Sequence, residues 1–226
     1  MKTQKVKVSE KDRDPYDGIR PWSAITHGIG VLLALIGASF LLMSAHASEK
    51  PWALVAVAVY LVTLGSLYLA STLYHCLKTS KKGRIWLRKI DHLNIYYLIA
   101  GTYTPFCLLA LGGVFGTVLL IVIWSLAIAG TAVNLIWIHL PRWLTSVIYI
   151  VMGWIVIGAI YPLGRALGAG GLFWLILGGL LYTTGGVLYA VKWPCRGNPR
   201  FGCHEIFHVF ILLGSIAQFV AVQYAL

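Results

Sequence analysis

Two histidines near the C-terminus, His204 and His208, have the spacing of a metal-binding pair. Because they are four residues apart, a helix would project both imidazoles from one face, one turn apart. Two neutral imidazoles at this spacing can bind one metal ion, and a further ligand must then come from another segment. In the alternative interpretation, each histidine is only hydrogen-bonded to a neighbouring carbonyl group. The spacing alone leaves both interpretations open.

The composition is that of a helical membrane protein. The chain of 226 residues is 59% hydrophobic and 11% charged, whereas a soluble domain is about 25% charged. Long apolar runs separated by short polar ones are typical of an all-α, polytopic membrane protein. At about 20 residues per span, the length predicts a bundle of seven transmembrane helices in one domain. The expected spans are about residues 22–44, 52–75, 91–111, 114–138, 143–161, 171–191 and 202–224.

The basic residues predict the orientation of these spans. Residues 1–20 are expected to form a basic cytoplasmic tail, residues 78–89 a basic loop and residues 161–170 a glycine-rich loop. With the N-terminus in the cytoplasm, sixteen of the 18 Lys and Arg residues face the cytoplasm, and only Lys50 and Arg165 lie outside. The positive-inside rule therefore predicts a cytoplasmic N-terminus and an external C-terminus in the plasma (inner) membrane. The net charge of +11 follows this distribution and does not indicate nucleic-acid binding.

This topology places polar residues from three spans at one membrane depth. His75 ends the second span, Asp91 begins the third, and His204 and His208 begin the seventh, all on the cytoplasmic side. Ionisable groups inside a membrane are costly and are usually functional. If the three spans are neighbours, three imidazoles and a carboxylate converge. Ser71 would lie one turn deeper than His75 on the same helical face.

Three imidazoles with one open position are typical of a catalytic zinc site. The open position would hold water, whose pKa zinc lowers to about 7. Asp91 would then orient or deprotonate that water, and Ser71 would hydrogen-bond Asp91, a histidine or a substrate carbonyl. Each residue also has an ordinary interpretation: Asp91 as a helix-start acid, His75 as an interfacial residue and Ser71 as a backbone-bonded serine. Their shared depth favours the site.

The remaining histidines and the cysteines are weaker candidates. His27, on the cytoplasmic side of the first span, could line the same cavity, whereas His92 would point about 100° away from Asp91 on a helix. His46 and His139 are expected at the surface. The cysteines show neither a CxxC pair nor a disulfide framework, and a zinc site that contains cysteine is a less favoured alternative. The cysteines are Cys76, Cys107, Cys195 and Cys203.

At these residues the sequence resembles the bacterial hemolysin III-related proteins, within the progestin and adiponectin receptor superfamily. The resemblance covers about residues 20–224. It implies a zinc site near the cytoplasmic face in which His75, His204 and His208 are direct ligands and Asp91 contacts the zinc-bound water. The family usually has Asn in the first span where this chain has Ser23, which leaves the role of that entrance open. The matching pieces are Ser71-Thr-Leu-Tyr-His75, Asp91-His92, Ala100-Gly-Thr-Tyr-Thr-Pro105-Phe106, His204-Glu-Ile-Phe-His208 and Thr26-His27-Gly28.

The resemblance also implies a function. The superfamily includes alkaline ceramidases, which suggests hydrolysis of a ceramide-like amide or ester of a membrane lipid, with Asp91 as the base and Ser71 assisting. Bacterial members are linked to membrane-fluidity homeostasis. One alternative is a zinc-stapled membrane sensor or receptor without turnover. Another is a pore-forming, cytolytic protein, as the family name implies, although the spans lack a continuous charged stripe. The sequence does not indicate the oligomeric state.

Overall fold

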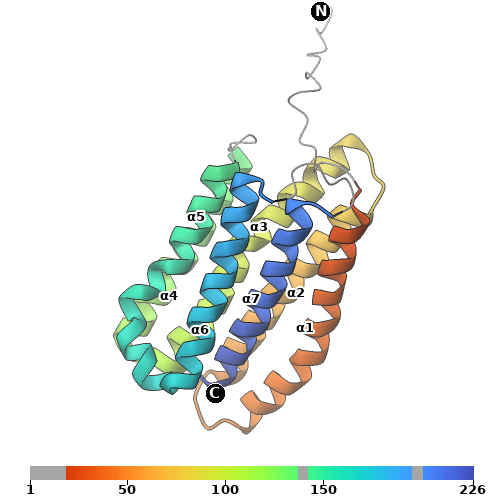
Figure 1. Ribbon diagram of the computed structural model, residues 1–226. Coiled ribbons are helices and arrows are strands. Elements are labelled where there is room, and N and C mark those ends of the chain that lie inside the picture. The colour runs from red at the N-terminus through yellow and green to blue at the C-terminus, as the bar shows by residue number, and fades with distance from the viewer. Residues whose placement is uncertain (1–18, 137–141, 195–200) are drawn as a thin grey trace, which may run out of the picture.

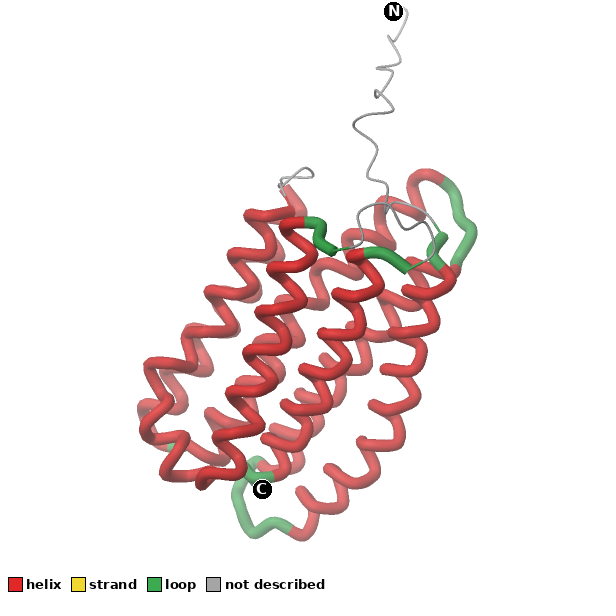
Figure 2. Tube along the Cα trace, viewed as in Figure 1, coloured by secondary structure: helices red, strands yellow, loops and turns green. Residues whose placement is uncertain are grey.

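The computed structural model describes residues 19–136, 142–194 and 201–226, and nearly all of these residues are helical (Figures 1 and 2). No strand occurs within those three ranges, which confirms the predicted all-α class. Most of the predicted tail, His139 and Cys195 lie outside the described residues. The elements are α1 (Pro21–Ala47), α2 (Ala53–Cys76), α3 (Lys81–Pro105), the π-helix η2 (Phe106–Leu111), α4 (Gly113–Ile136), α5 (Arg142–Trp154), the 3-10 helix η3 (Ile155–Ala159), α6 (Ile160–Val191) and α7 (Cys203–Gln223).

Six helical stretches in the described part of the chain are long and apolar enough to cross a membrane. Five of them are α1, α2, α3 with η2, α4 and α7. The sixth, Trp143–Val191, has 49 residues. A straight helix of that length would measure about 74 Å, more than twice the hydrocarbon thickness of about 30 Å. Instead, Gly168 has non-helical dihedral angles (φ 68°, ψ 178°), and α5 and α6 run side by side (Figure 1).

The outer surface of the bundle is apolar. On α1, five large apolar side chains are each more than half exposed: Leu32, Leu35, Ile36, Phe40 and Met43. Exposed apolar surface of this extent is unfavourable in water. In a bilayer the same side chains contact lipid, while the helices satisfy their own backbone hydrogen bonds. The exposed faces and the apolar helices together indicate an integral membrane protein.

The basic loop predicted at residues 78–89 is mostly helical. The helix α3 begins at Lys81, ten residues before the expected start of the span at Asp91. The Ser80 side chain caps it by accepting a hydrogen bond from the backbone N–H of Gly83 (3.2 Å). Arg84 then fixes the first turns to α2, because its guanidinium donates to the carbonyl oxygen of Tyr74 (2.7 Å). Lys and Arg favour helix formation, so the helix extends beyond the apolar run that the prediction followed.

The glycine-rich loop predicted at residues 161–170 is also largely helical. The helix α6 begins at Ile160, and within it Gly168 alone leaves the helical region. Leu163 and Leu167 are buried on this segment. Their burial outweighs the cost of glycine in a helix, about 1 kcal/mol per residue relative to alanine. The prediction relied on glycine content and therefore placed a loop where the chain keeps its helical backbone.

Proline and glycine mark the end of the third helix. The helix α3 ends at Pro105, and η2 continues with π-helical hydrogen bonding. Proline lacks the N–H that an α-helix needs at this position. Gly112 and Gly113 then take positive φ angles of 59° and 55°, a conformation that other residues rarely adopt. This turn leads directly into α4.

The packing of the helices brings three helix ends together. The helix α1 packs against α2 and α7, α2 also packs against α3, and α7 lies between α1 and α6 (Figure 1). The backbone N–H of Arg20, just before α1, donates to the carbonyl oxygen of His75 at the end of α2 (3.0 Å). The start of α1, the end of α2 and the start of α7 therefore meet at one end of the bundle.

Candidate metal centre and adjoining cavity

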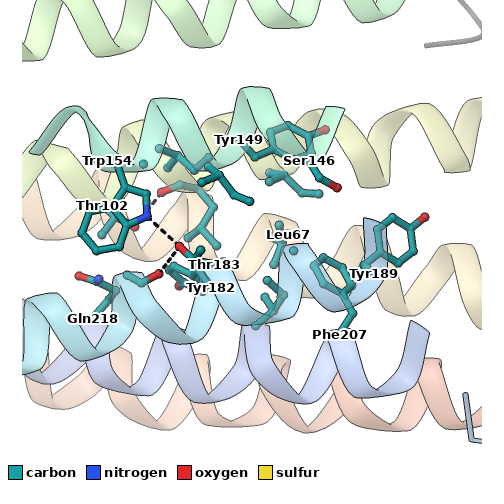
Figure 3. A pocket seen from close by; sticks show the side chains of 18 of the residues that line it. Leu67, Thr102, Ser146, Tyr149, Trp154, Tyr182, Thr183, Tyr189, Phe207 and Gln218 are labelled. Atoms are coloured by element: carbon teal, nitrogen blue, oxygen red, sulfur yellow. Dashed lines mark hydrogen bonds between the residues drawn. The ribbon is translucent and has the colours of Figure 1, made fainter. Parts of the chain in front are cut away.

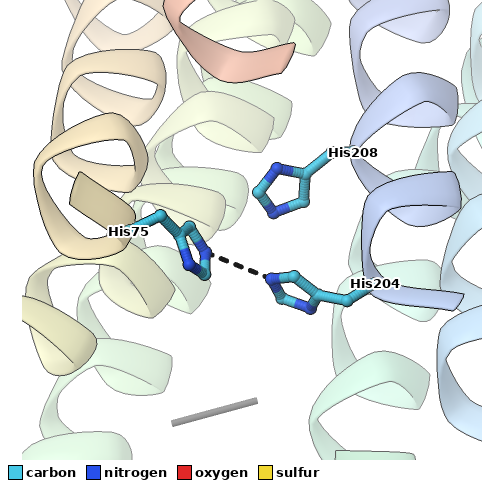
Figure 4. Close-up of side chains that lie close together, drawn as sticks. All are labelled: His75, His204 and His208. Atoms are coloured by element: carbon cyan, nitrogen blue, oxygen red, sulfur yellow. Dashed lines mark hydrogen bonds between the residues drawn. The ribbon is translucent and has the colours of Figure 1, made fainter. Parts of the chain in front are cut away.

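Three imidazoles meet at this end of the bundle (Figure 4). His75 comes from the last turn of α2, and His204 and His208 come from the first two turns of α7. Their candidate ligand atoms all lie within 4.8 Å of one another. The Nε2 atoms of His75 and His204 are 3.1 Å apart. All three side chains are buried. The structure thus brings together the three histidines that were selected from the sequence.

A carbonyl group orients the imidazole of His208. Its Nδ1 lies 3.2 Å from the carbonyl oxygen of Ser23 and 3.3 Å from the Thr26 hydroxyl. Because a carbonyl oxygen can only accept a hydrogen bond, the contact with Ser23 assigns the proton to Nδ1. The Nε2 atom then keeps its lone pair for a metal ion. Such a partner on the second ring nitrogen is usual for histidine ligands.

The donor set suits a transition-metal ion. Two nitrogens bound to one tetrahedral zinc at 2.0–2.1 Å lie about 3.3 Å apart, close to the 3.1 Å between the Nε2 atoms of His75 and His204. Imidazole nitrogen suits Zn, Cu, Fe and Ni, whereas Ca²⁺ and Mg²⁺ prefer oxygen ligands. The group contains no carboxylate. The three histidines could therefore hold one ion and leave a position for another ligand.

Asp91 and Ser71 lie beside this cluster rather than in it. A cavity of about 170 Å³ is lined by Ser71, Asp91, His204 and His208, although not by His75. Asp91 and Ser71 are buried, and the carboxylate is near enough to interact with the Ser71 hydroxyl. Within the described residues, that hydroxyl makes no hydrogen bond of standard geometry. Asp91 and Ser71 thus share a cavity with two of the three imidazoles, those of His204 and His208.

The cavity extends away from the histidines along the inside of the bundle. Its walls come mainly from α2, α3, α5, α6 and α7, with His27 from α1, and are mostly aromatic and aliphatic, with isolated hydroxyl and amide groups (Figure 3). Along α7 the lining residues range from His204 to Gln218. On α7, the ten residues from His208 to Gln218 correspond to about 15 Å. An elongated apolar group would fit such a space, with its polar end at the histidines.

His27 is a fourth histidine at the site. Its ring stacks on His208 with centroids 3.6 Å apart and an interplanar angle of 12°, and it meets Tyr68 edge-on. Neither ring nitrogen has a hydrogen-bond partner in the described part of the chain. The prediction that His27 lines the cavity is confirmed. It is not part of the three-histidine group.

The other candidates take separate positions. His92 also lines the cavity, although it does not join the three histidines. His46 is exposed, as expected. Cys76 is exposed, whereas Cys107 and Cys203 are buried. Among the described residues, no cysteine belongs to the candidate metal group.

A partly buried ion pair beside the site was not predicted from the sequence. The Arg20 guanidinium donates to both carboxylate oxygens of Glu205, at 2.8 and 2.9 Å. The Ser23 hydroxyl donates to the same carboxylate (2.8 Å). An acid on an apolar helix signals that a partner exists, but 18 Lys and Arg residues were available to fill that role. Only the contact between α1 and α7 identifies Arg20.

This ion pair changes the interpretation of the His-Glu-x-x-His order at residues 204–208. In zinc metallopeptidases with that order, the glutamate is the general base. Here the Glu205 carboxylate is fully buried and is held by α1 and by the backbone N–H of Gly202 (2.8 Å). It is therefore not available as a base at the histidines. Ser23 contacts both Glu205 and His208.

Comparison with known proteins gives a consistent result. A family model described as "Haemolysin-III related" matches residues 21–219. The chain is 42% identical over 202 residues to a "Hemolysin-3 homolog" of Bacillus subtilis (strain 168), covering 89% of this chain and 92% of the relative. It is 38% identical over 203 residues to "Hemolysin-3" of Bacillus cereus, covering 89% of each. It is 24% identical over 204 residues to the human "Monocyte to macrophage differentiation factor", covering 87% of this chain and 80% of that protein.

Proposed function

The chain belongs to the haemolysin-III related family, and we propose that it is a seven-span membrane enzyme that binds zinc and hydrolyses a membrane lipid. The bond cleaved is a ceramide-like amide or an ester. One observation carries the proposal: two of the three clustered, buried imidazoles line an apolar cavity that is also lined by a buried carboxylate and a buried hydroxyl. The product of such a reaction would serve membrane-lipid and fluidity homeostasis.

The proposed topology has seven spans, with the N-terminus in the cytoplasm. The 49-residue stretch Trp143–Val191 is long enough for two crossings, which makes seven from six stretches. Sixteen of the 18 Lys and Arg residues then face the cytoplasm. In this orientation the three histidines lie near the cytoplasmic face of the plasma (inner) membrane. The substrate would enter from the surrounding lipid.

The residues of the cavity have distinct roles in the proposed reaction. A bound zinc ion would polarise the scissile carbonyl and lower the pKa of water to about 7. Asp91 would orient the attacking water, accept its proton and return that proton to the departing nitrogen or oxygen as the C–N or C–O bond breaks. Ser71 donates its hydroxyl hydrogen to the substrate carbonyl oxygen. The apolar walls hold the acyl chain and exclude bulk water.

Turnover by purified protein tests the enzyme hypothesis. The zinc-loaded protein in lipid micelles is incubated with ceramide and with phospholipid, and released fatty acid is measured by mass spectrometry. We expect release that stops when a chelator removes the metal and resumes when zinc is returned. Asp91→Asn is the matched control, since it leaves the three histidines in place. A metal-loaded wild-type protein that releases no chelator-sensitive product from any lipid tested would contradict the hypothesis.

A zinc-stapled sensor without turnover is the second candidate. It is favoured by the position of the histidines, which join the end of α2 to the start of α7 while Asp91 lies outside the group. Metal would then fix the two helices relative to each other, and His204→Ala would lower the unfolding temperature although the wild type hydrolyses nothing. A lytic pore, suggested by the names of the two Bacillus relatives, would instead produce conductance in reconstituted bilayers.

A further inference from the structure

We infer that Arg20 and Glu205 are positioning residues of the metal centre, through which the first turn of α1 holds the histidine ligands in place. The inference rests on the proposed metal binding and adds two residues that do not touch the metal. Glu205 directly follows His204 and lies three residues before His208. A displacement of its carboxylate would therefore also displace the turn of α7 that carries both candidate ligands.

The Glu205 carboxylate is held at both oxygens. Arg20 Nε lies 2.8 Å from Oε1, and Arg20 Nη2 lies 2.9 Å from Oε2. The Ser23 hydroxyl donates to Oε1 and the Gly202 backbone N–H donates to Oε2, each at 2.8 Å. Paired guanidinium–carboxylate bonds of this kind fix direction as well as distance. With Glu205 fully buried, the first turn of α7 has one orientation relative to α1.

The same stretch of α1 also contacts two of the ligands directly. The carbonyl oxygen of Ser23 accepts the hydrogen bond from Nδ1 of His208 (3.2 Å). The backbone N–H of Arg20 donates to the carbonyl oxygen of His75 (3.0 Å). The four residues 20–23 thus join α2 and α7 at the point where their histidines face each other. A shift of this segment would move the ligands relative to one another.

Stability alone does not account for the ion pair. An ion pair taken largely out of water contributes little net stability compared with an apolar pair of similar volume, because the charges lose hydration, and here Glu205 is fully buried and Arg20 partly so. The best-attested use of such buried polar groups is to fix register between helices. Here the ion pair would fix how α1, α2 and α7 are placed relative to one another, and so where the three candidate ligand nitrogens lie. Lysine would not replace Arg20, because it is a point charge without the paired donors.

Zinc affinity tests the inference without any need for turnover. Purified wild type, Glu205→Gln and Arg20→Lys are titrated with zinc against a competing chelator, and their unfolding temperatures are measured with and without zinc. We expect the affinity to fall by about 10- to 100-fold, as for other residues that orient metal ligands. The rise in unfolding temperature on zinc binding should shrink in both variants, because it depends on affinity.

Ser215→Ala is the matched control for a loss of stability. Ser215 is buried on the same helix and hydrogen-bonds Tyr182 (2.9 Å), away from the three histidines. It should lower the unfolding temperature equally with and without zinc and leave the affinity unchanged.

Wild-type zinc affinity in both ion-pair variants would overturn the inference, as would an equal loss of affinity in Ser215→Ala. If Glu205→Gln does not fold, Arg20→Lys, which retains the charge pair, decides alone. A wild type that binds no zinc, in contrast, would overturn the proposed function itself.

Discussion

The three candidate ligands differ in how firmly their rings are held. His208 is fixed on one edge by the Ser23 carbonyl and on its face by His27. The Nδ1 atom of His75 has no hydrogen-bond partner in the described part of the chain. Its imidazole is oriented by packing against Tyr74 and by the contact with His204. A metal ion would therefore constrain His75 most and His208 least.

Replacement of any one ligand should abolish tight metal binding. For His75→Ala, His204→Ala and His208→Ala we expect a large loss of zinc affinity. Replacing a residue that only orients a ligand typically lowers affinity by about 10- to 100-fold, and the loss here should exceed that. Metal content after dialysis and chelator competition both report this loss. His46→Ala, which removes an exposed histidine outside the group, is the control and should retain wild-type zinc content. Equal zinc content in all four variants would contradict a three-histidine site.

The ring of His27 and its nitrogens should have separable roles. His27→Phe keeps an aromatic ring against His208 and Tyr68 but removes both ring nitrogens, which make no hydrogen bond within the described residues. If a nitrogen bonds the substrate, kcat/KM should fall by about 2- to 12-fold, the equivalent of one hydrogen bond. Zinc affinity should be unchanged. Loss of zinc together with activity would show that His27 supports the ligands instead.

At the level of helices, close packing sets the spacing of α1 and α2. Gly30 on α1 faces Tyr68 on α2, and a Cβ at Gly30 would collide with the tyrosine ring. Gly30→Ala should therefore destabilise the protein by about 1–3 kcal/mol, the range for overpacked cores. Gly65→Ala, on α2, is the control, because its added Cβ meets nothing within 4 Å. Thermal unfolding in micelles should separate the two, and equal unfolding temperatures would contradict this packing.

The sequence predicted the meeting of α2 and α7 but not the part played by α1. Charge asymmetry and hydrophobic runs place His75, His204 and His208 at one end of a bundle, and the structure brings them together. The partner of Glu205 could not be predicted in this way, because it depends on which helix lies beside α7. The start of α3 and the extent of α6 were also misjudged, since hydrophobic runs mark the apolar part of a helix and not its caps.

For the molecule as a whole, the direction of the bundle decides which compartment the site faces. The described chain starts at the end of the bundle that holds the histidines and finishes at the other (Figure 1). The apolar faces of the helices show that the bundle lies in a membrane but do not define its direction. The distribution of basic residues predicts that direction through the positive-inside rule. The orientation of the bundle therefore also determines from which compartment the metal ion would be supplied.

Cysteine labelling at two positions on opposite ends of the bundle can determine its orientation in the membrane. Cys76, next to the candidate ligand His75, is exposed, and so is Glu49 in the connection between α1 and α2. In cells expressing a Cys195→Ser background, a membrane-impermeant maleimide should label Glu49→Cys at once. It should label Cys76 only after the membrane is permeabilised, because the proposed orientation places the histidines at the cytoplasmic face. Cys107 and Cys203 are buried and should stay unreactive in the folded protein.

The reverse labelling pattern would place the metal centre at the outer face of the membrane. Asp91 and Ser71 would then act on lipids of the outer leaflet, and the cytoplasmic zinc pool could not supply the ion.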